Sequence, residues 1–186
     1  MKQPPRGAQF GTMRTTRVEF FRDALTRLEN EAGTIISLIE EHNRRSPRKI
    51  GFWAGIRLLM PIVEAVAHVA GESPQEFLGA HLHVEVPNLM WDLFRHSLIH
   101  GDYPHTAKYG NKEVKWGISF SGMEHDVMRG TNMPSVVGVD IPTLYGDLKA
   151  YLETEVAKND QTQVDIEVGV IYHTPKPNIE EEFNNL

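Results

Sequence analysis

The sequence predicts an α+β fold that is predominantly α, in which a helical region is followed by a small antiparallel sheet with one helix. Three observations favour this class. Apolar residues recur at helical spacing over most of residues 18–106, they alternate with polar residues in later stretches, and Pro and Gly mark the borders between segments. With 186 residues, of which 40% are hydrophobic, the chain has the size and composition of one globular domain.

The first expected helix extends from Val18 to about Asn43. Its apolar residues recur every three or four positions, as in an amphipathic helix: Phe21, Leu25, Leu28, Ile35, Leu38 and Ile39. Gly33 lies near the middle, and because glycine costs roughly 1 kcal/mol relative to alanine inside a helix, we expect a weakened or kinked helix there. Residues 1–17 contain prolines and glycines and lack a long apolar run, which predicts a flexible arm without a signal peptide.

The second expected helix begins at Ser46 and Pro47, a capping residue followed by proline at the first helical position, and ends at Gly71. It contains the most apolar stretch of the chain. Polar residues and a proline interrupt this stretch: Arg57, Pro61, Glu64 and His68. A span of about 20 apolar residues is therefore missing, and we expect no membrane-spanning segment.

Two shorter helices complete the helical region. Ser73, followed by proline, and Glu76 have the spacing of a capping box and predict a third helix that continues to Leu82. Pro87 then opens a fourth helix, which covers residues 88–100 and ends before a glycine.

Residues 107–174 are expected to form a small α/β extension that shares the core of the helices. Residues 114–120 and 164–172 alternate between apolar and polar, as in strands with one buried face, and 136–139 is a short apolar run that suggests a partner strand. Between them, a helix starting at Pro142 has strongly periodic apolar residues. We expect an antiparallel sheet that is too small to bury a core alone.

The charge of the chain limits its partners. A net charge of −6 argues against a broadly basic surface, so any contact with nucleic acid has to be local. We interpret the basic run Arg44, Arg45, Arg48 and Lys49, and the acidic tail 175–186, as solvated segments. The absence of cysteine excludes disulfides, thiolate metal sites and cysteine nucleophiles, and favours a cytoplasmic protein.

The fourth helix has two chemically different sides at about 100° per residue. One side is expected in the core: Met90, Trp91, Leu93, Phe94, Ser97 and Leu98. The opposite side is polar: Asn88, Asp92, Arg95, His96 and His100. Ionisable groups are costly to bury unpaired, so this side should face a cleft, a partner or its own members. In the structural alternative, Asp92 pairs with Arg95 or His96, and His100 caps the helix C-terminus.

The stretch from Leu93 to Gly101 resembles the signature of HEPN domains (higher eukaryotes and prokaryotes nucleotide-binding). In that family an arginine, a polar residue and a histidine lie on one late helix of a small helical bundle. Here four residues separate Arg95 from His100, and His96 occupies the polar position. The resemblance extends at most over residues 18–106, and the later sheet departs from the minimal family pattern.

The resemblance implies an RNA-binding or nucleotide-binding protein, and for many family members a metal-independent endoribonuclease of a toxin or defence system that acts as a homodimer. His100 would then be the general base for a ribose 2′-hydroxyl, and Arg95 would hold the phosphate. His96 would orient the substrate or share the proton transfer, and Asp92 and Asn88 would contribute to substrate binding. We expect dimerisation through the fourth helix, no cofactor and no membrane association.

Two alternatives stay open. The first is a HEPN-like module that binds or dimerises without catalysis. The second is a metal-dependent hydrolase, because His96 and His100 have the i, i+4 spacing of helical zinc ligands. Other candidate ligands are near in sequence: His81, His83, Asp102 and His105. A metalloprotease places glutamate after its first histidine, whereas here Ser97 follows His96, so the metal alternative ranks lower.

Overall fold

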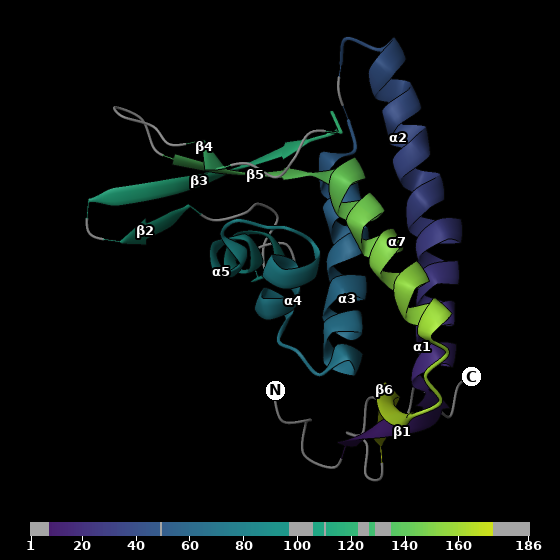
Figure 1. Cartoon of the computed structure of the whole chain (residues 1–186). Helices are drawn as coiled ribbons and strands as arrows, with labels where there is room; N and C mark the ends of the chain where they lie inside the picture. Colours follow the sequence, from purple (N-terminus) through teal and green to yellow (C-terminus); the bar gives the residue numbers. More distant parts are fainter. Residues whose placement is uncertain are drawn as a thin grey trace.

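The computed structural model describes residues 8–48, 50–96, 106–109, 111–122, 127–128 and 135–172. Over these residues the fold is α+β and predominantly helical, as the sequence predicts (Figure 1). The helical elements are α1 (Arg17–Arg27), the π-helical turn η1 (Leu28–Gly33), α2 (Thr34–Arg45), α3 (Phe52–Ala70), α4 (Pro74–His81), α5 (Pro87–Met90), the π-helical turn η2 (Trp91–His96) and α7 (Ile141–Lys158). The strands are β1 (Ala8–Thr16), β2 (Ala107–Tyr109), β3 (Lys112–Ser119), β4 (Val127–Met128), β5 (Ser135–Asp140) and β6 (Gln163–Tyr172).

The first expected helix is present as the continuous run α1, η1 and α2. Thr16 caps its start, because its side chain accepts a hydrogen bond from the backbone N–H of Glu19 and the Glu19 carboxylate accepts one from the N–H of Thr16. The irregularity expected near Gly33 takes the form of η1. A Cβ atom at Gly33 would lie 2.7 Å from the Tyr145 hydroxyl oxygen, so glycine permits the close approach of α7 at this turn.

The second expected helix, α3, begins five residues later than the sequence suggests. Ser46 ends α2, since its N–H donates to the carbonyl of His42 at 2.9 Å. The Asn43 side chain then accepts a hydrogen bond from the Ile50 N–H at 2.9 Å and donates one to the Ile50 carbonyl at 3.1 Å. These bonds fold the α2–α3 connection into a loop, and Gly51 (φ 80°) redirects the chain into α3.

Helix α3 ends as predicted, with Gly71 in the left-handed region at φ 85°. Among the described residues it is the one helix with the length and composition to cross a membrane. Its Ile56, Leu59, Val63 and Val66 side chains are fully buried in the protein core, an arrangement also typical of the central helix of a globular domain. The start of α4 is confirmed as well, because Ser73 and Glu76 form the expected capping box.

The sheet is not wholly antiparallel, which corrects the expectation. Its strand order is β2-β3-β5-β4, and β3 pairs with β5 in parallel, with Val114 opposite Ser135. Alternation of apolar residues identifies a strand but not the direction of its neighbour. The connection 120–134 exceeds the roughly dozen residues that a parallel return needs.

The last strand belongs to a separate ribbon. Strand β6 pairs with β1 in an antiparallel two-stranded sheet that runs from Thr16 opposite Gln163 to Ala8 opposite Tyr172. Residues 8–16, expected in a flexible arm, therefore form a strand. Their partner strand, β6, lies some 150 residues away in the chain, so local sequence patterns could not predict this pairing. The acidic tail 175–186 lies outside the described residues.

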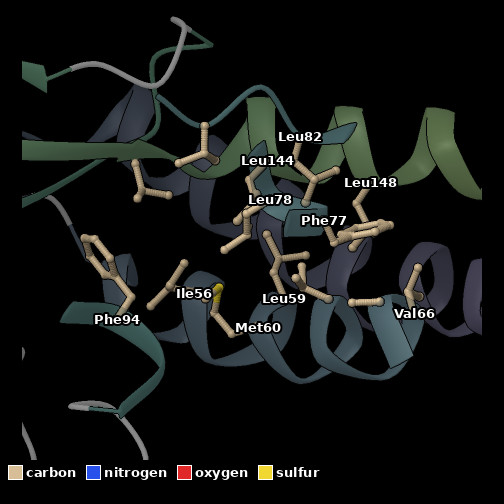
Figure 2. Close-up of a cluster of buried hydrophobic side chains, with 14 of the residues drawn as sticks. Ile56, Leu59, Met60, Val66, Phe77, Leu78, Leu82, Phe94, Leu144 and Leu148 are labelled. Carbon is tan, nitrogen blue, oxygen red and sulfur yellow. The ribbon is translucent and has the colours of Figure 1, made fainter. Parts of the chain in front are cut away.

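One apolar cluster joins the helical region to the later extension. Ile56 and Leu59 of α3 share it with Phe77 of α4 and with Leu144 and Leu148 of α7 (Figure 2). Strand β5 contributes Val137 and Val139 to the same cluster. The α5–η2 segment is anchored there through Phe94, which is fully buried.

Candidate functional site

The apolar side of the fourth expected helix packs into the core along α5 and η2. Met90, Leu93 and Phe94 are buried to 2% exposure or less, and Trp91 is 6% exposed. This agrees with the predicted division of the helix for the residues that the structure describes. Ser97 and Leu98 lie outside them.

The structure describes only some side chains of the polar side of this helix. Asn88 and Asp92 are exposed to solvent. Arg95 and His96 belong to η2 by their backbone, but their side chains lie outside the described part of the chain, as does the whole of His100. The structure therefore brings Asn88 and Asp92 to the surface of the segment that carries the HEPN-like motif, and leaves the mutual geometry of Arg95, His96 and His100 as a prediction.

The backbone of this segment differs from the straight α-helix assumed from the sequence. Residues Trp91–His96 form a π-helical turn, in which hydrogen bonds link residues five apart rather than four. Around this turn, a rotation of 100° per residue no longer describes the relative direction of Asp92 and the motif residues. Single π-helical turns inside α-helices are frequent at functional sites, which is consistent with the position of Arg95 and His96 in η2.

His81 has a local structural role. Its Nε2 atom lies 3.0 Å from the Glu72 carboxylate, and its ring packs on Phe77 and Tyr151 at centroid distances of 5.0 and 4.8 Å. Burial raises the pKa of Tyr151 to about 12, and the negative charges of Glu155 and Glu72 act in the same direction. His81 is thus part of an aromatic and acidic cluster that joins α4 to α7, a contact that the sequence did not reveal.

The residues proposed as metal ligands are only partly described. His83, exposed and with φ 54°, does not join His81 in a cluster of candidate ligands. Within the ranges that the structure describes, no group of three His, Asp or Glu side chains has the geometry to hold a metal ion. The remaining candidates, Asp102 and His105, lie outside those ranges.

Sequence reasoning missed a buried carboxylate, Asp140, at the junction of β5 and α7. It is 1% exposed and caps α7 by accepting hydrogen bonds from the N–H and hydroxyl of Thr143 at 3.1 and 2.9 Å. Further donors come from the end of β3 and the turn after it: the hydroxyls of Ser119 and Ser121 and the N–H groups of Ser121 and Gly122. The aspartate followed by Ile141 and Pro142 was the available cue for a helix cap.

The ionisation of Asp140 is set by these contacts. Burial alone would raise the pKa of this carboxyl, but the hydrogen bonds from Ser119, Ser121 and Thr143 outweigh it and lower the pKa below its ordinary value. All the donors belong to the chain's own backbone and side chains. Asp140 is therefore a structural anion that ties β3 to the start of α7.

Several hollows open on the described surface, and two of them lie where helices meet strands. The first, about 450 Å³, lies where the end of α2, the start of α3 and the end of β3 meet, and its lining residues are Glu40, Asn43, Arg44, Phe52 and Ile118 to Ser121. The second, about 850 Å³, lies between α1, α3 and the β1–β6 ribbon. It combines apolar side chains such as Met13 and Phe20 with the charged Asp23, Arg27 and Glu64.

None of the comparisons with family models, curated proteins and solved structures finds a match for this chain. The resemblance to HEPN domains therefore depends on the motif around Arg95 and His100 and on its position in the chain.

Proposed function

We propose that the chain binds RNA at the α5–η2 segment and the residues that follow it, and that it cleaves RNA without a metal ion. One observation carries the proposal: the described residues that lead into the motif bury Met90, Leu93 and Phe94 on one side and present Asn88 and Asp92 to solvent on the other. The buried apolar side holds the segment in place, and the polar residues on its exposed side can contact an external ligand.

The proposed chemistry uses an imidazole and a guanidinium. His100 removes the proton from a ribose 2′-hydroxyl, and the resulting oxygen attacks the adjacent phosphorus. The bond from phosphorus to the 5′-oxygen of the next nucleotide breaks, and that oxygen takes up a proton. The products are a 2′,3′-cyclic phosphate and a 5′-hydroxyl end. Arg95 holds two phosphate oxygens as negative charge accumulates on them.

The other residues of the strip support these two. His96 orients the substrate or delivers the proton to the leaving oxygen. Asp92 and Asn88 contact the RNA from the preceding turn. One protomer supplies a single Arg95 and His100 pair, and a two-fold dimer through this segment would place two pairs in one groove.

The decisive experiment measures cleavage of a labelled RNA in the presence of a chelator. Changing His100→Ala should reduce the rate by about 10² to 10⁴-fold, a typical general-base contribution, with little loss of binding. Changing Arg95→Ala should weaken both binding and cleavage, and Arg95→Lys should restore binding better than cleavage because lysine lacks the forked geometry.

Matched controls are available on the exposed surface. His83→Asn removes an imidazole and keeps a residue that tolerates positive φ, and Arg57→Ala removes an exposed arginine from α3. Neither should change cleavage. If the wild-type protein binds RNA and forms dimers but does not cleave it, the non-catalytic HEPN-like module replaces the nuclease. If His100→Ala and Arg95→Ala both lose several kcal/mol of stability, the strip is a structural network and the proposal is wrong.

A further inference from the structure

The hollow at the α2–α3 junction has an aromatic wall. Phe52 begins α3 and Phe120 follows β3, and their ring centroids lie 5.6 Å apart in an edge-to-face arrangement. Phe120 is held in place on its other side, because a Cβ atom at Gly55 would lie only 3.2 Å from its Cζ atom. Paired rings on the wall of an open cavity offer a surface on which a planar base can pack.

The polar lining is preorganised. The Ser119 hydroxyl donates to Asp140, and the Ser121 hydroxyl, with one hydrogen, has two acceptors in reach, Asp140 at 3.1 Å and the Ser119 oxygen at 3.3 Å. The Ser121 oxygen therefore keeps acceptor capacity for a ligand's N–H group. The Asn43 amide bonds to both the N–H and the carbonyl of Ile50 and fixes the loop at this end of the hollow. The cavity, about 450 Å³, therefore has its shape and an acceptor before any ligand arrives.

The rim of the hollow carries one arginine, Arg44, and one carboxylate, Glu40. Arg44 lines it with a side chain 71% exposed, and the exposed Arg45 and Arg48 follow in the sequence. Glu41 pairs with Arg44 and Arg45, but pairs this exposed contribute little, so a phosphate can compete for the guanidinium groups. The larger groove beside α1 carries two carboxylates, Asp23 and Glu64, beside one arginine, Arg27, whereas the lining of the smaller hollow has one carboxylate and one arginine.

We propose that this hollow binds a 5′-mononucleotide unit, with the base against Phe52 and Phe120 and the phosphate on Arg44. The aromatic wall can pack on the base, and the Ser121 oxygen can accept a hydrogen bond from an exocyclic amine of the base. The guanidinium group can bind two oxygens of the nucleotide's phosphate. That the nucleotide belongs to RNA rests on the proposed function. Figure 2 shows Phe94, the residue before Arg95, close to Ile56 near the start of α3, the helix whose first residue, Phe52, lines the hollow.

The test is calorimetric titration of the full-length protein with AMP, with adenosine and ribose 5-phosphate as half-ligands. AMP should bind more tightly than either half-ligand. Arg44→Ala should weaken AMP binding by about tenfold and leave adenosine binding unchanged, since a charged hydrogen bond is lost. Phe52→Leu, which keeps apolar bulk but removes the ring, should weaken AMP and adenosine binding by about tenfold.

Arg27→Ala is the matched control for Arg44→Ala, because Arg27 is an arginine that lines the other groove. It should leave AMP binding intact, and equal effects of the two substitutions would overturn the proposal, as would absence of AMP binding at millimolar concentration. Competition with a short RNA separates the two proposals. If a short RNA displaces AMP, the hollow is part of the RNA-binding surface. If the protein binds AMP but not RNA, the nucleotide site is confirmed and the proposed function is wrong.

Discussion

Helix α7 and the α5–η2 segment each begin with proline in the first turn and bury an apolar side, but they differ in where polar residues lie relative to solvent. At α7 the capping carboxylate and one lysine have partners within the chain. Asp140 accepts hydrogen bonds from four residues, and Lys149 pairs with Glu29 at 2.7 Å. In α5–η2, Asn88 and Asp92 are exposed beside the motif. A buried polar group that the fold satisfies stabilises it, whereas an exposed polar residue also lies within reach of an external ligand.

The largest stability effect should come from Asp140→Ala. This change removes the cap of α7 and leaves the donors of Ser119, Ser121 and Thr143, which are only partly buried, without the buried carboxylate that accepts from them, so the free energy of unfolding should fall by about 2 to 3 kcal/mol. Urea denaturation followed by circular dichroism measures it. A loss below about 1 kcal/mol would show that these donors find other partners and would weaken the contrast between the two segments.

Acidification should remove a smaller part of the same contribution. The pKa of Asp140 in the folded state lies below its ordinary value, so its ionised form stabilises the fold above the unfolded pKa, and this stability is lost as the pH falls through the folded pKa. We expect the unfolding free energy of the wild type to decrease more between pH 6 and about pH 3 than that of Asp140→Asn. Parallel curves for the two proteins would contradict a structural role for the charge.

Gly33→Ala tests the packing of α7 against η1. The new methyl group would lie 2.7 Å from the Tyr145 hydroxyl oxygen and 3.1 Å from its ring, and overpacking of this kind costs about 1 to 3 kcal/mol. Better helix propensity offsets about 1 kcal/mol of it, which leaves a net loss of about 1 kcal/mol. In a Tyr145→Phe background the loss should shrink, because the closest atom is gone. A double-mutant cycle gives this coupling, and zero coupling would mean that α7 shifts freely.

The smallest stability effect is expected for Asp92→Ala. Because Asp92 is exposed, its removal should change the unfolding free energy by less than about 0.5 kcal/mol, while RNA binding should change measurably. Thermal denaturation and a binding titration on the same protein provide both readings. A large loss of stability would place Asp92 with Asp140 among the structural anions and remove the contrast.

Local chemistry allowed much of the helical region to be predicted. Ser73 and Glu76 mark a capping box, Gly71 ends α3, and the buried sides of α5 and η2 follow from the spacing of Met90 and Phe94. These features depend on residues within one or two turns of each other, where sequence spacing translates directly into contact. The candidate site was predicted from the same kind of local spacing, so the types of its residues could be named from the sequence. The π-helical turn that contains Arg95 could not be predicted in this way.

Contacts between distant segments decided the rest. The parallel pairing of β3 with β5, the ribbon of β1 with β6 and the donors around Asp140 join residues that are far apart in the sequence. The nucleotide-sized hollow likewise needs Phe52 and Phe120 side by side. The sequence by itself determined the helical class, the glycine that ends α3, the capping box of α4 and the residue types of the Arg95 and His100 motif, because propensity and periodicity act locally. Only the tertiary structure decided strand partners, buried anions and cavities, because these depend on which surfaces meet when the core closes.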